Sequence, residues 1–126
     1  MSRLLVVDDE ANIRLLYAEE LKDEGYEVVT AASSAEAAEK LQGGVFDLAV
    51  LDIKLKNESG IELLQKLVKE RHEMPVILCS AFSCYKDDFS AWLADGYVVK
   101  SGDLTELKQE IARVLAKKAQ KIKAGL

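Results

Sequence analysis

Short stretches of uninterrupted apolar residues place the strongest restriction on the fold of this chain. The clearest are Leu4–Val7, Leu48–Leu51 and Val76–Cys79. A strand with one face in water alternates apolar and polar residues, so a run that is apolar at every position indicates a strand buried on both faces. Glu27–Ala31 and Tyr97–Val99 are two further candidates. Such strands are typical of a parallel sheet covered by helices on both sides.

Amphipathic helices are predicted between these runs. Apolar residues recur at helical spacing in five segments: residues 13–21, 37–41, 61–68, 85–93 and 104–115. Ser33, Ser59 and Asp103 each precede a glutamate by three residues, which is the pattern of a capping box at a helix start. Five strands alternating with five helices predict an α/β fold. We expect a doubly wound, five-stranded parallel sheet of the flavodoxin-like order 2-1-3-4-5, with the polar strand Glu27–Ala31 at one edge.

Length and charge indicate one globular domain covering residues 1–126. Nearly half of the chain is apolar, which is enough to build a core without disulfides, and Cys79 and Cys84 are interpreted as reduced. The formal net charge of −5 argues against direct binding of nucleic acid or of an anionic membrane surface. No apolar run approaches the ~20 residues needed to span a bilayer, so we expect no membrane insertion and a cytoplasmic location.

Polar side chains stand where four of the five predicted strands end. Asp8 and Asp9 follow the first strand, Asp52 the third, Ser80 the fourth and Lys100 the fifth. In a doubly wound sheet the carboxyl ends of the strands meet at one edge, where the ligand site lies. Three carboxylates packed together repel one another unless a cation lies among them. Mg²⁺ favours a few carboxylates together with water and phosphate oxygens, so the set indicates phosphoryl transfer.

Each of these residues also has an ordinary interpretation. Asp52 alone could be a solvated acid at the end of a strand, and Asp8 could merely cap the first helix. Ser80 alone could be a turn serine, and Lys100 a solvated lysine. Their joint placement at four strand ends favours the functional interpretation.

The motifs together resemble the receiver domain of two-component response regulators. They read VVDDE, LDIKLKNESG, CSA and YVVKSGDLTEL, and the resemblance runs from Ser2 to about Ala119. The resemblance implies that Asp52 accepts a phosphoryl group from a phosphohistidine. It also implies that Mg²⁺ is bound by Asp9, Asp52 and the backbone carbonyl of Lys54, and by Asp8 through a water molecule.

The same resemblance implies the other roles at the site. Ser80 and Lys100 would hold the phosphoryl oxygens, and Tyr97 would be the aromatic switch that turns inward when Ser80 moves. The implied partners are a sensor histidine kinase or phosphotransfer protein, and a downstream effector or second copy bound through the fourth helix, fifth strand and fifth helix. The chain would catalyse only its own phosphorylation and slow dephosphorylation.

The sequence departs from the family pattern at two places near the site. Lys56 and Ser101 stand where proline is common. The family usually has a cis peptide bond after the conserved lysine, so we predict a cis bond between Lys100 and Ser101 despite its cost of ~3–4 kcal/mol before a residue other than proline.

Two other functions remain as alternatives. A Mg²⁺-dependent phosphohydrolase that works through an aspartyl-phosphate would have a similar nucleophile, but such enzymes generally need an acid two residues later, where this chain has Lys54. A pseudo-receiver would bind its partner without phosphorylation, and the intact set of acids, hydroxyl and lysine argues against it.

Overall fold

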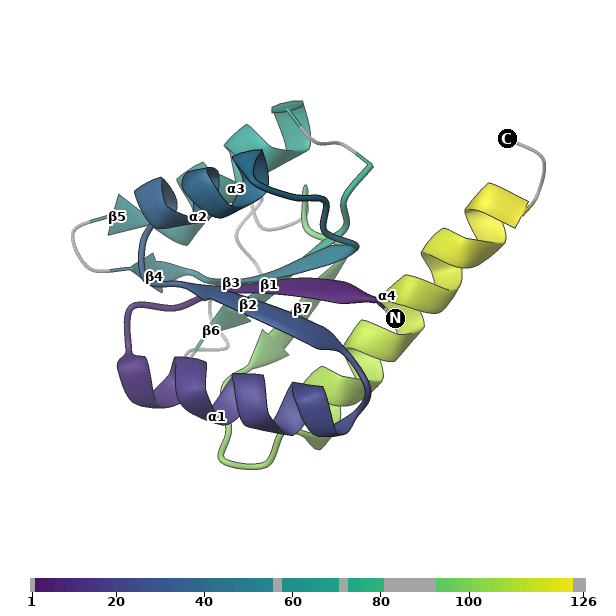
Figure 1. The fold of residues 1–126 in the computed structure, drawn as a ribbon, viewed down its shortest axis with the longest axis horizontal. Helices are drawn as coiled ribbons and strands as arrows, with labels where there is room; N and C mark the ends of the chain where they lie inside the picture. The colour runs from purple at the N-terminus through teal and green to yellow at the C-terminus, as the bar shows by residue number, and fades with distance from the viewer. Residues whose placement is uncertain (1, 56–57, 71–72, 81–92, 124–126) are drawn as a thin grey trace.

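The computed structural model describes residues 2–55, 58–70, 73–80 and 93–123, and the side chains of all of these except 58 and 121–123. Its elements are, in chain order, β1 (Arg3–Val7), α1 (Ala11–Asp23), β2 (Glu27–Ala31), α2 (Ser34–Gln42), β3 (Leu48–Asp52), β4 (Lys54–Leu55), β5 (Glu58–Ser59), α3 (Gly60–Glu70), β6 (Val76–Ser80), β7 (Gly96–Val99) and α4 (Thr105–Lys123) (Figure 1). The helix expected over residues 85–93 lies almost entirely outside the described residues.

The five long strands form one parallel sheet in the order β2-β1-β3-β6-β7. Counted among the long strands alone, this is the predicted order 2-1-3-4-5. The strands β4 and β5 form a separate antiparallel hairpin that the sequence pattern did not predict. The hairpin follows Asp52 directly, and the N–H of Gly60 donates to the carbonyl of Ile53 at its base (2.7 Å). The α/β fold with a doubly wound sheet is therefore confirmed.

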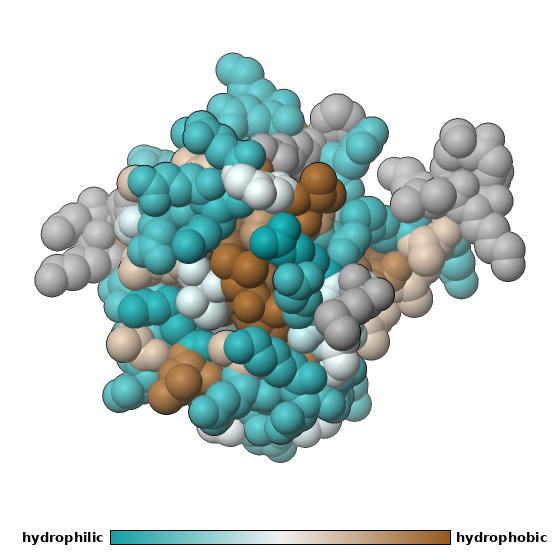
Figure 2. All heavy atoms as spheres, viewed as in Figure 1, coloured by the Kyte–Doolittle hydropathy of each residue, from teal (hydrophilic) through white to brown (hydrophobic). Residues whose placement is uncertain are grey.

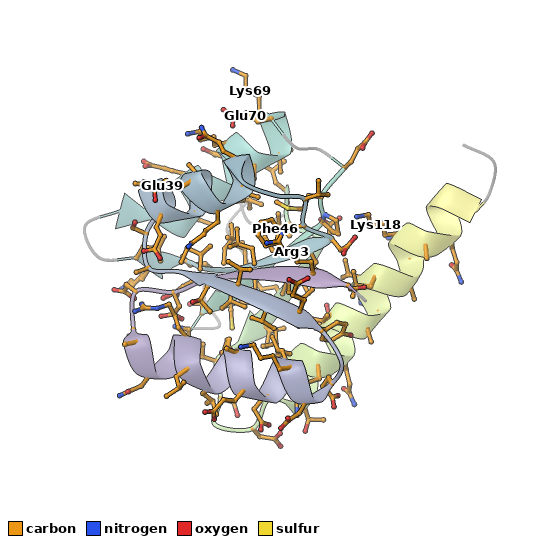
Figure 3. All side chains as sticks on the ribbon, in the orientation of Figure 1. Arg3, Glu39, Phe46, Lys69, Glu70 and Lys118 are labelled. Atoms are coloured by element: carbon orange, nitrogen blue, oxygen red, sulfur yellow. The ribbon has the colours of Figure 1, made fainter. Side chains whose placement is uncertain are left out.

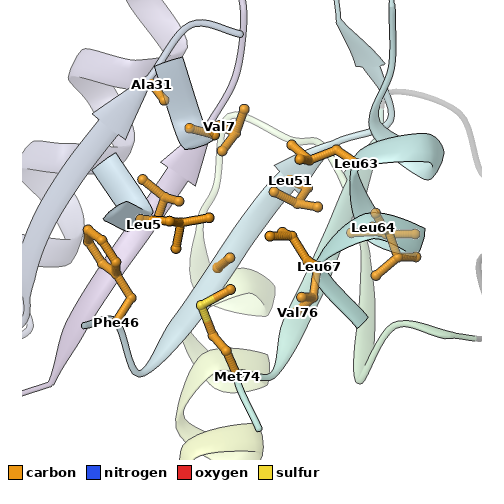
Figure 4. Packing of buried hydrophobic residues seen from close by; sticks show 14 of the residues in the cluster. Leu5, Val7, Ala31, Phe46, Leu51, Leu63, Leu64, Leu67, Met74 and Val76 are labelled. Atoms are coloured by element: carbon orange, nitrogen blue, oxygen red, sulfur yellow. The ribbon is translucent and has the colours of Figure 1, made fainter. Parts of the chain in front are cut away.

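Two apolar cores lie on opposite faces of the sheet. One joins the sheet to α2 and α3, and Figure 4 shows Leu51 and Leu67 packed together in it. The other joins the sheet to α1 and α4 and contains Tyr17, Val50 and Ile111. Helices thus cover both faces, as the uniformly apolar strands β3 and β6 require.

The strand β2 is less apolar than the other long strands because it lies at the edge of the sheet, where it is only partly covered. Val28 and Val29 are only partly buried, and each packs against a different core. Figure 2 shows this edge as a hydrophobic strip between the hydrophilic surfaces of the two helix layers. Glu27 begins the strand in an exposed position beside Arg3, at 3.8 Å, and a charge on an edge strand discourages pairing with another sheet.

The amino ends of the strands are fastened by charged side chains. The guanidinium of Arg3 lies 4.6 Å from the centre of the Phe46 ring, and Lys118 of α4 reaches the same region (Figure 3). The Lys118 ammonium donates to the backbone carbonyl of Asp47 (3.3 Å), while the side chain of Asp47 accepts from the Arg3 N–H (2.7 Å). These contacts hold α4 against the end of the sheet opposite the carboxyl ends of the strands.

Helix starts agree with the predicted caps in part. The Ser33 hydroxyl accepts from the N–H of Glu36 (3.2 Å), and the Ser59 hydroxyl accepts from the N–H of Ile61 (3.1 Å). Asp103 precedes α4 and accepts from the N–H of Thr105 (2.9 Å). Among the helices described, none is long and apolar enough to cross a membrane.

The predicted cis bond between Lys100 and Ser101 is wrong. The described part of the chain contains no cis peptide bond. A bond that precedes serine keeps the full trans preference of a secondary amide, which proline would have removed. With serine in place of the family's proline, the peptide bond after Lys100 is therefore trans.

Candidate functional site

The candidate site lies at the carboxyl ends of β1, β3, β6 and β7. Side chains alternate along a strand, and the packing shows which way each end residue points. Val6 and Val50 belong to the core facing α1 and α4. Asp8 and Asp52, two residues further along β1 and β3, therefore stand on that same side. Both are almost fully buried, with 2% and 6% of their surface exposed.

Lys100 connects these two carboxylates. Its ammonium lies 2.7 Å from Oδ2 of Asp8 and 3.1 Å from Oδ2 of Asp52. The Lys100 side chain is itself only 14% exposed. The backbone N–H of Lys100 donates to the carbonyl of Ser80 (2.6 Å). This bond fixes the backbone of Lys100 beside the end of β6. An ammonium with little solvent exposure, held between two buried carboxylates, is the central feature of the site.

Backbone donors satisfy the remaining carboxylate oxygens. Oδ1 of Asp8 accepts from the N–H of Glu10 (2.9 Å), and Oδ1 of Asp52 accepts from the N–H of Lys54 (3.2 Å). The Arg14 guanidinium donates to the backbone carbonyl of Asp8 (2.7 Å) and so ties α1 to the end of β1. These hydrogen bonds hold both carboxylates in place.

The electrostatics of the site make Asp52 an unusual acid. Burial raises its pKa from the ordinary 3.8 to about 6; Lys100 opposes this shift, and the negative charge of Asp8 adds to it. For Lys100, burial disfavours the charge, but the hydrogen bond to Asp8 and the attraction of Asp52 outweigh it and raise its pKa. Lys100 therefore stays protonated, while Asp52 is ionised above about pH 6.

A second group of acids lies at the mouth of the site. One carboxylate oxygen from each of Asp8, Asp9 and Glu10 lies within 4.8 Å of the others. Glu10 was not predicted, although it directly follows the two aspartates in the sequence. Hard oxygen ligands at this density suit a divalent cation such as Mg²⁺. Among the described residues Asp52 is not part of this group; its Oδ2 lies 3.1 Å from the Lys100 ammonium.

Three other predicted residues lie in the strands β6, β7 and β4. Ser80 ends β6 and is buried, with 2% of its surface exposed. Tyr97 lies in β7 and is partly buried against the core that faces α2 and α3. The side chain of Lys54, two residues after Asp52, is exposed.

Sequence reasoning missed two close contacts. The hydroxyl of Tyr17 lies 3.5 Å from the sulfur of Cys79, and both side chains are buried next to the carboxylates. Tyr17 was read only as an apolar residue of the first helix. The second contact is at Gly60, where an added Cβ would lie 2.8 Å from the carbonyl carbon of Asp52. The only sequence signal for it was a glycine at a helix start.

Comparison with known proteins identifies the class of domain that this fold and site define. Residues 4–112 match the family described as the response regulator receiver domain. The chain belongs to this family.

Particular relatives agree with this assignment. The response regulator ArlR of Staphylococcus aureus is 31% identical over 123 residues, which are 96% of this chain and 56% of ArlR. The chain therefore spans about half the length of the curated relatives it matches.

Solved structures of other receiver proteins are also similar. The response regulator TrrA of Thermotoga maritima, in complex with Mg²⁺-BeF, is 46% identical with a TM-score of 0.86, over 90% of this chain and 98% of that one. A chain of the complex between histidine kinase ThkA and TrrA is 46% identical with a TM-score of 0.85, over 91% and 99%. A CheY-like receiver domain protein of Methanospirillum hungatei is 32% identical with a TM-score of 0.89, over 96% and 98%.

Proposed function

We propose that this domain is a phosphorylation-activated switch whose phosphoacceptor is Asp52. The observation that carries the proposal is the position of Lys100, whose ammonium lies within 3.1 Å of Asp52 and 2.7 Å of Asp8. A cation already fixed beside the carboxylate can stabilise the charge of an incoming phosphoryl group without further reorganisation. Membership of the receiver family supports the same assignment.

In the proposed reaction an oxygen of the Asp52 carboxylate attacks the phosphorus atom of a phosphohistidine. An O–P bond forms while the N–P bond breaks, and its electron pair returns to the imidazole of the donor. Asp52 must be ionised to act as nucleophile, and its pKa of about 6 leaves it ionised near neutral pH. Lys100 stays charged and contacts a phosphoryl oxygen, and Ser80 donates a hydrogen bond to another.

Mg²⁺ is the proposed cofactor, and the residues present fit it. Carboxylate oxygens of Asp8, Asp9 and Glu10 converge within 4.8 Å, which is the hard oxygen donor set that this ion requires. Asp9, Asp52 and the carbonyl of Lys54 would hold the ion, with Asp8 acting through water. When bound, Mg²⁺ would neutralise charge on the transferred phosphoryl group. The structure of TrrA with Mg²⁺-BeF supports this proposal by analogy.

The partners follow from the same mechanism. A sensor histidine kinase or phosphotransfer protein would supply the phosphoryl group, as the structure of ThkA with TrrA illustrates for a relative. Movement of Ser80 toward the phosphoryl group and of Tyr97 inward would change the surface that includes β7 and α4. A downstream effector or a second copy would bind there. We infer a cytoplasmic location and no catalysis beyond self-phosphorylation and slow dephosphorylation.

One experiment tests the assignment directly. The protein is incubated with acetyl phosphate and Mg²⁺, and the intact mass is measured. We expect a gain of one phosphoryl group that disappears in an Asp52→Asn variant and persists in an Asp103→Asn variant, whose exposed carboxylate lies outside the site. An undiminished gain in Asp52→Asn would refute the assignment, and steady turnover of a small phosphomonoester would favour a phosphohydrolase instead.

A further inference from the structure

A buried polar pair lies beside the carboxylates without a role in the mechanism described so far. The hydroxyl of Tyr17, on α1, and the thiol of Cys79, on β6, are 3.5 Å apart. Tyr17 is 2% exposed and Cys79 is 1% exposed. A thiol is a weak hydrogen-bonding partner, so a tyrosine here gains less from its hydroxyl than an ordinary buried tyrosine does. Plain core packing would be served as well by phenylalanine.

The sheet order places Cys79 under the path of the Lys100 side chain. Cys79 pairs in register with Asp52 on one side and with Val98 on the other, because β6 lies between β3 and β7. Cys79 and Val98 both belong to the core facing α1 and α4, and Lys100 stands two residues after Val98 on the same face. To reach Asp52 on β3, the Lys100 side chain must therefore cross β6 on the side where Cys79 lies.

Tyr17, on α1, lies against Cys79 on this face of the sheet. It contacts Cys79 from α1, and its pKa is raised chiefly by burial, with smaller contributions from Cys79, Asp8 and Asp52. Burial likewise raises the pKa of Cys79 to about 11, an effect that the nearby Lys100 charge partly offsets. Both groups thus remain protonated and neutral near pH 7. They form a wall without charge, which offers the ammonium no competing anion along its path.

We propose that Tyr17 and Cys79 are positioning residues that hold the Lys100 side chain within reach of Asp52 and of the phosphoryl group it accepts. The phosphoryl part of this statement rests on the proposed function, whereas the observed position of the Lys100 ammonium beside Asp8 and Asp52 does not. A lysine has a long, flexible stem that adopts many conformations when unconfined. The wall restricts that freedom, so that the ammonium is already in place when the reaction begins.

The test measures the accessibility of the Lys100 amine directly. Wild type, Tyr17→Phe and Cys79→Leu are labelled briefly with trace acetic anhydride, and acylation of each lysine is read by peptide mass spectrometry. Tyr17→Phe removes one hydroxyl and keeps the ring, and Cys79→Leu places bulk under the lysine stem. We expect Lys100 to label about threefold faster or more in each variant, as a displaced side chain would. Lys108, which pairs with Glu20 away from the site (3.1 Å), should label at the same rate in all three proteins.

Tyr26→Phe is the matched control, since Tyr26 packs against the same core but lies outside the site. Unchanged Lys100 labelling in Tyr17→Phe would overturn the proposal even if Cys79→Leu does not fold. Equal increases at Lys100 and Lys108 would also overturn it, because they would show general loosening of the domain.

Initial phosphorylation rates with acetyl phosphate give a second measurement. They should fall by about threefold to tenfold in the two variants and stay unchanged in Tyr26→Phe. If wild type shows no phosphoryl gain at all, the proposed function fails, while the labelling result still decides whether the wall positions Lys100.

Discussion

Replacement of Asp52 by asparagine is expected to stabilise the domain at neutral pH. Asp52 and Asp8 are both buried, and a single ammonium lies between them. Asparagine keeps the shape of the side chain and removes one of the two negative charges. Lys100 keeps its 2.7 Å contact with Asp8 in the variant, so no charge is left without a partner. The negative charge that the proposed chemistry requires at Asp52 therefore lowers the stability of the fold.

The magnitude follows from the pKa of Asp52. Folding raises this pKa from 3.8 to about 6, so the folded state binds the proton more tightly than the unfolded state. The contribution of Asp52 to stability is therefore most favourable below about pH 4, and it is lost as the pH rises to about 6. At about 1.4 kcal/mol for each pKa unit, the loss is at most about 3 kcal/mol at higher pH. We expect Asp52→Asn to gain about 1–3 kcal/mol in free energy of unfolding at pH 8.

Urea unfolding of both proteins at several values between pH 4 and pH 8 measures this difference. The gap between variant and wild type should widen from pH 4 to about pH 6 and stay constant above it. Mg²⁺ should stabilise wild type and narrow the gap, because a ligand that binds only the folded state adds to stability. The m-value should be the same in both proteins, which shows that the surface exposed on unfolding is unchanged.

Two results would refute this reasoning. Wild type could be as stable as Asp52→Asn at pH 8, which would mean that Lys100 and the backbone donors fully compensate for burial. Alternatively, the gap could be independent of pH, which would place the effect in packing and not in the charge of Asp52.

Two further predictions concern the surroundings of Asp52. Gly60→Ala should destabilise the domain by about 2 kcal/mol or more, because the added Cβ would lie 2.8 Å from the carbonyl carbon of Asp52 and 2.9 Å from the Cα of Ile53. Thermal unfolding measures this loss of stability. Gly102→Ala is the control and should change stability little, because no atom lies within 4 Å of the added Cβ. Lys100→Met should cost about 3 kcal/mol at pH 8, as loss of one partner from a buried ion pair does. The cost should shrink toward pH 5, where Asp52 takes up a proton, and urea unfolding that shows the same loss at both pH values would contradict the electrostatic origin.

The sheet could be predicted from sequence because its signals are local. Leu48–Leu51 is apolar at each position, and a strand of that kind needs cover on both faces. Right-handed crossovers left few possible orders, and the polar strand Glu27–Ala31 at the edge favoured 2-1-3-4-5, which the structure has among its long strands. The hairpin of β4 and β5 escaped prediction because two-residue strands carry no periodicity. The wrong prediction of a cis bond at Lys100 came from the family pattern, whereas the serine at 101 carried the correct information.

The candidate site was predictable only as a set of strand ends. The positions of Asp8, Asp52 and Lys100 follow from parallel strands that finish at one edge. The ion pairs of Lys100 with the two carboxylates do not follow from the strand positions, because they depend on which face each side chain occupies and on how far the lysine side chain reaches. Sequence reasoning placed a metal ion among the acids to relieve their repulsion. The structure shows that Lys100 also supplies positive charge there, at 2.7 Å and 3.1 Å from the two carboxylates.

On the proposed mechanism, β6 contains a residue that stays still, Cys79, next to one that moves, Ser80. Cys79 faces Tyr17 and the core under α1 and α4, so Ser80, the next residue, points toward the opposite side of the sheet. A Ser80 hydroxyl that is to reach a phosphoryl group on Asp52 has to cross the end of its own strand. On the same proposal, the contact between Tyr17 and Cys79 would hold the preceding residue during that movement. On the proposed mechanism, the backbone change that signals phosphorylation therefore begins at Ser80, the last residue of β6.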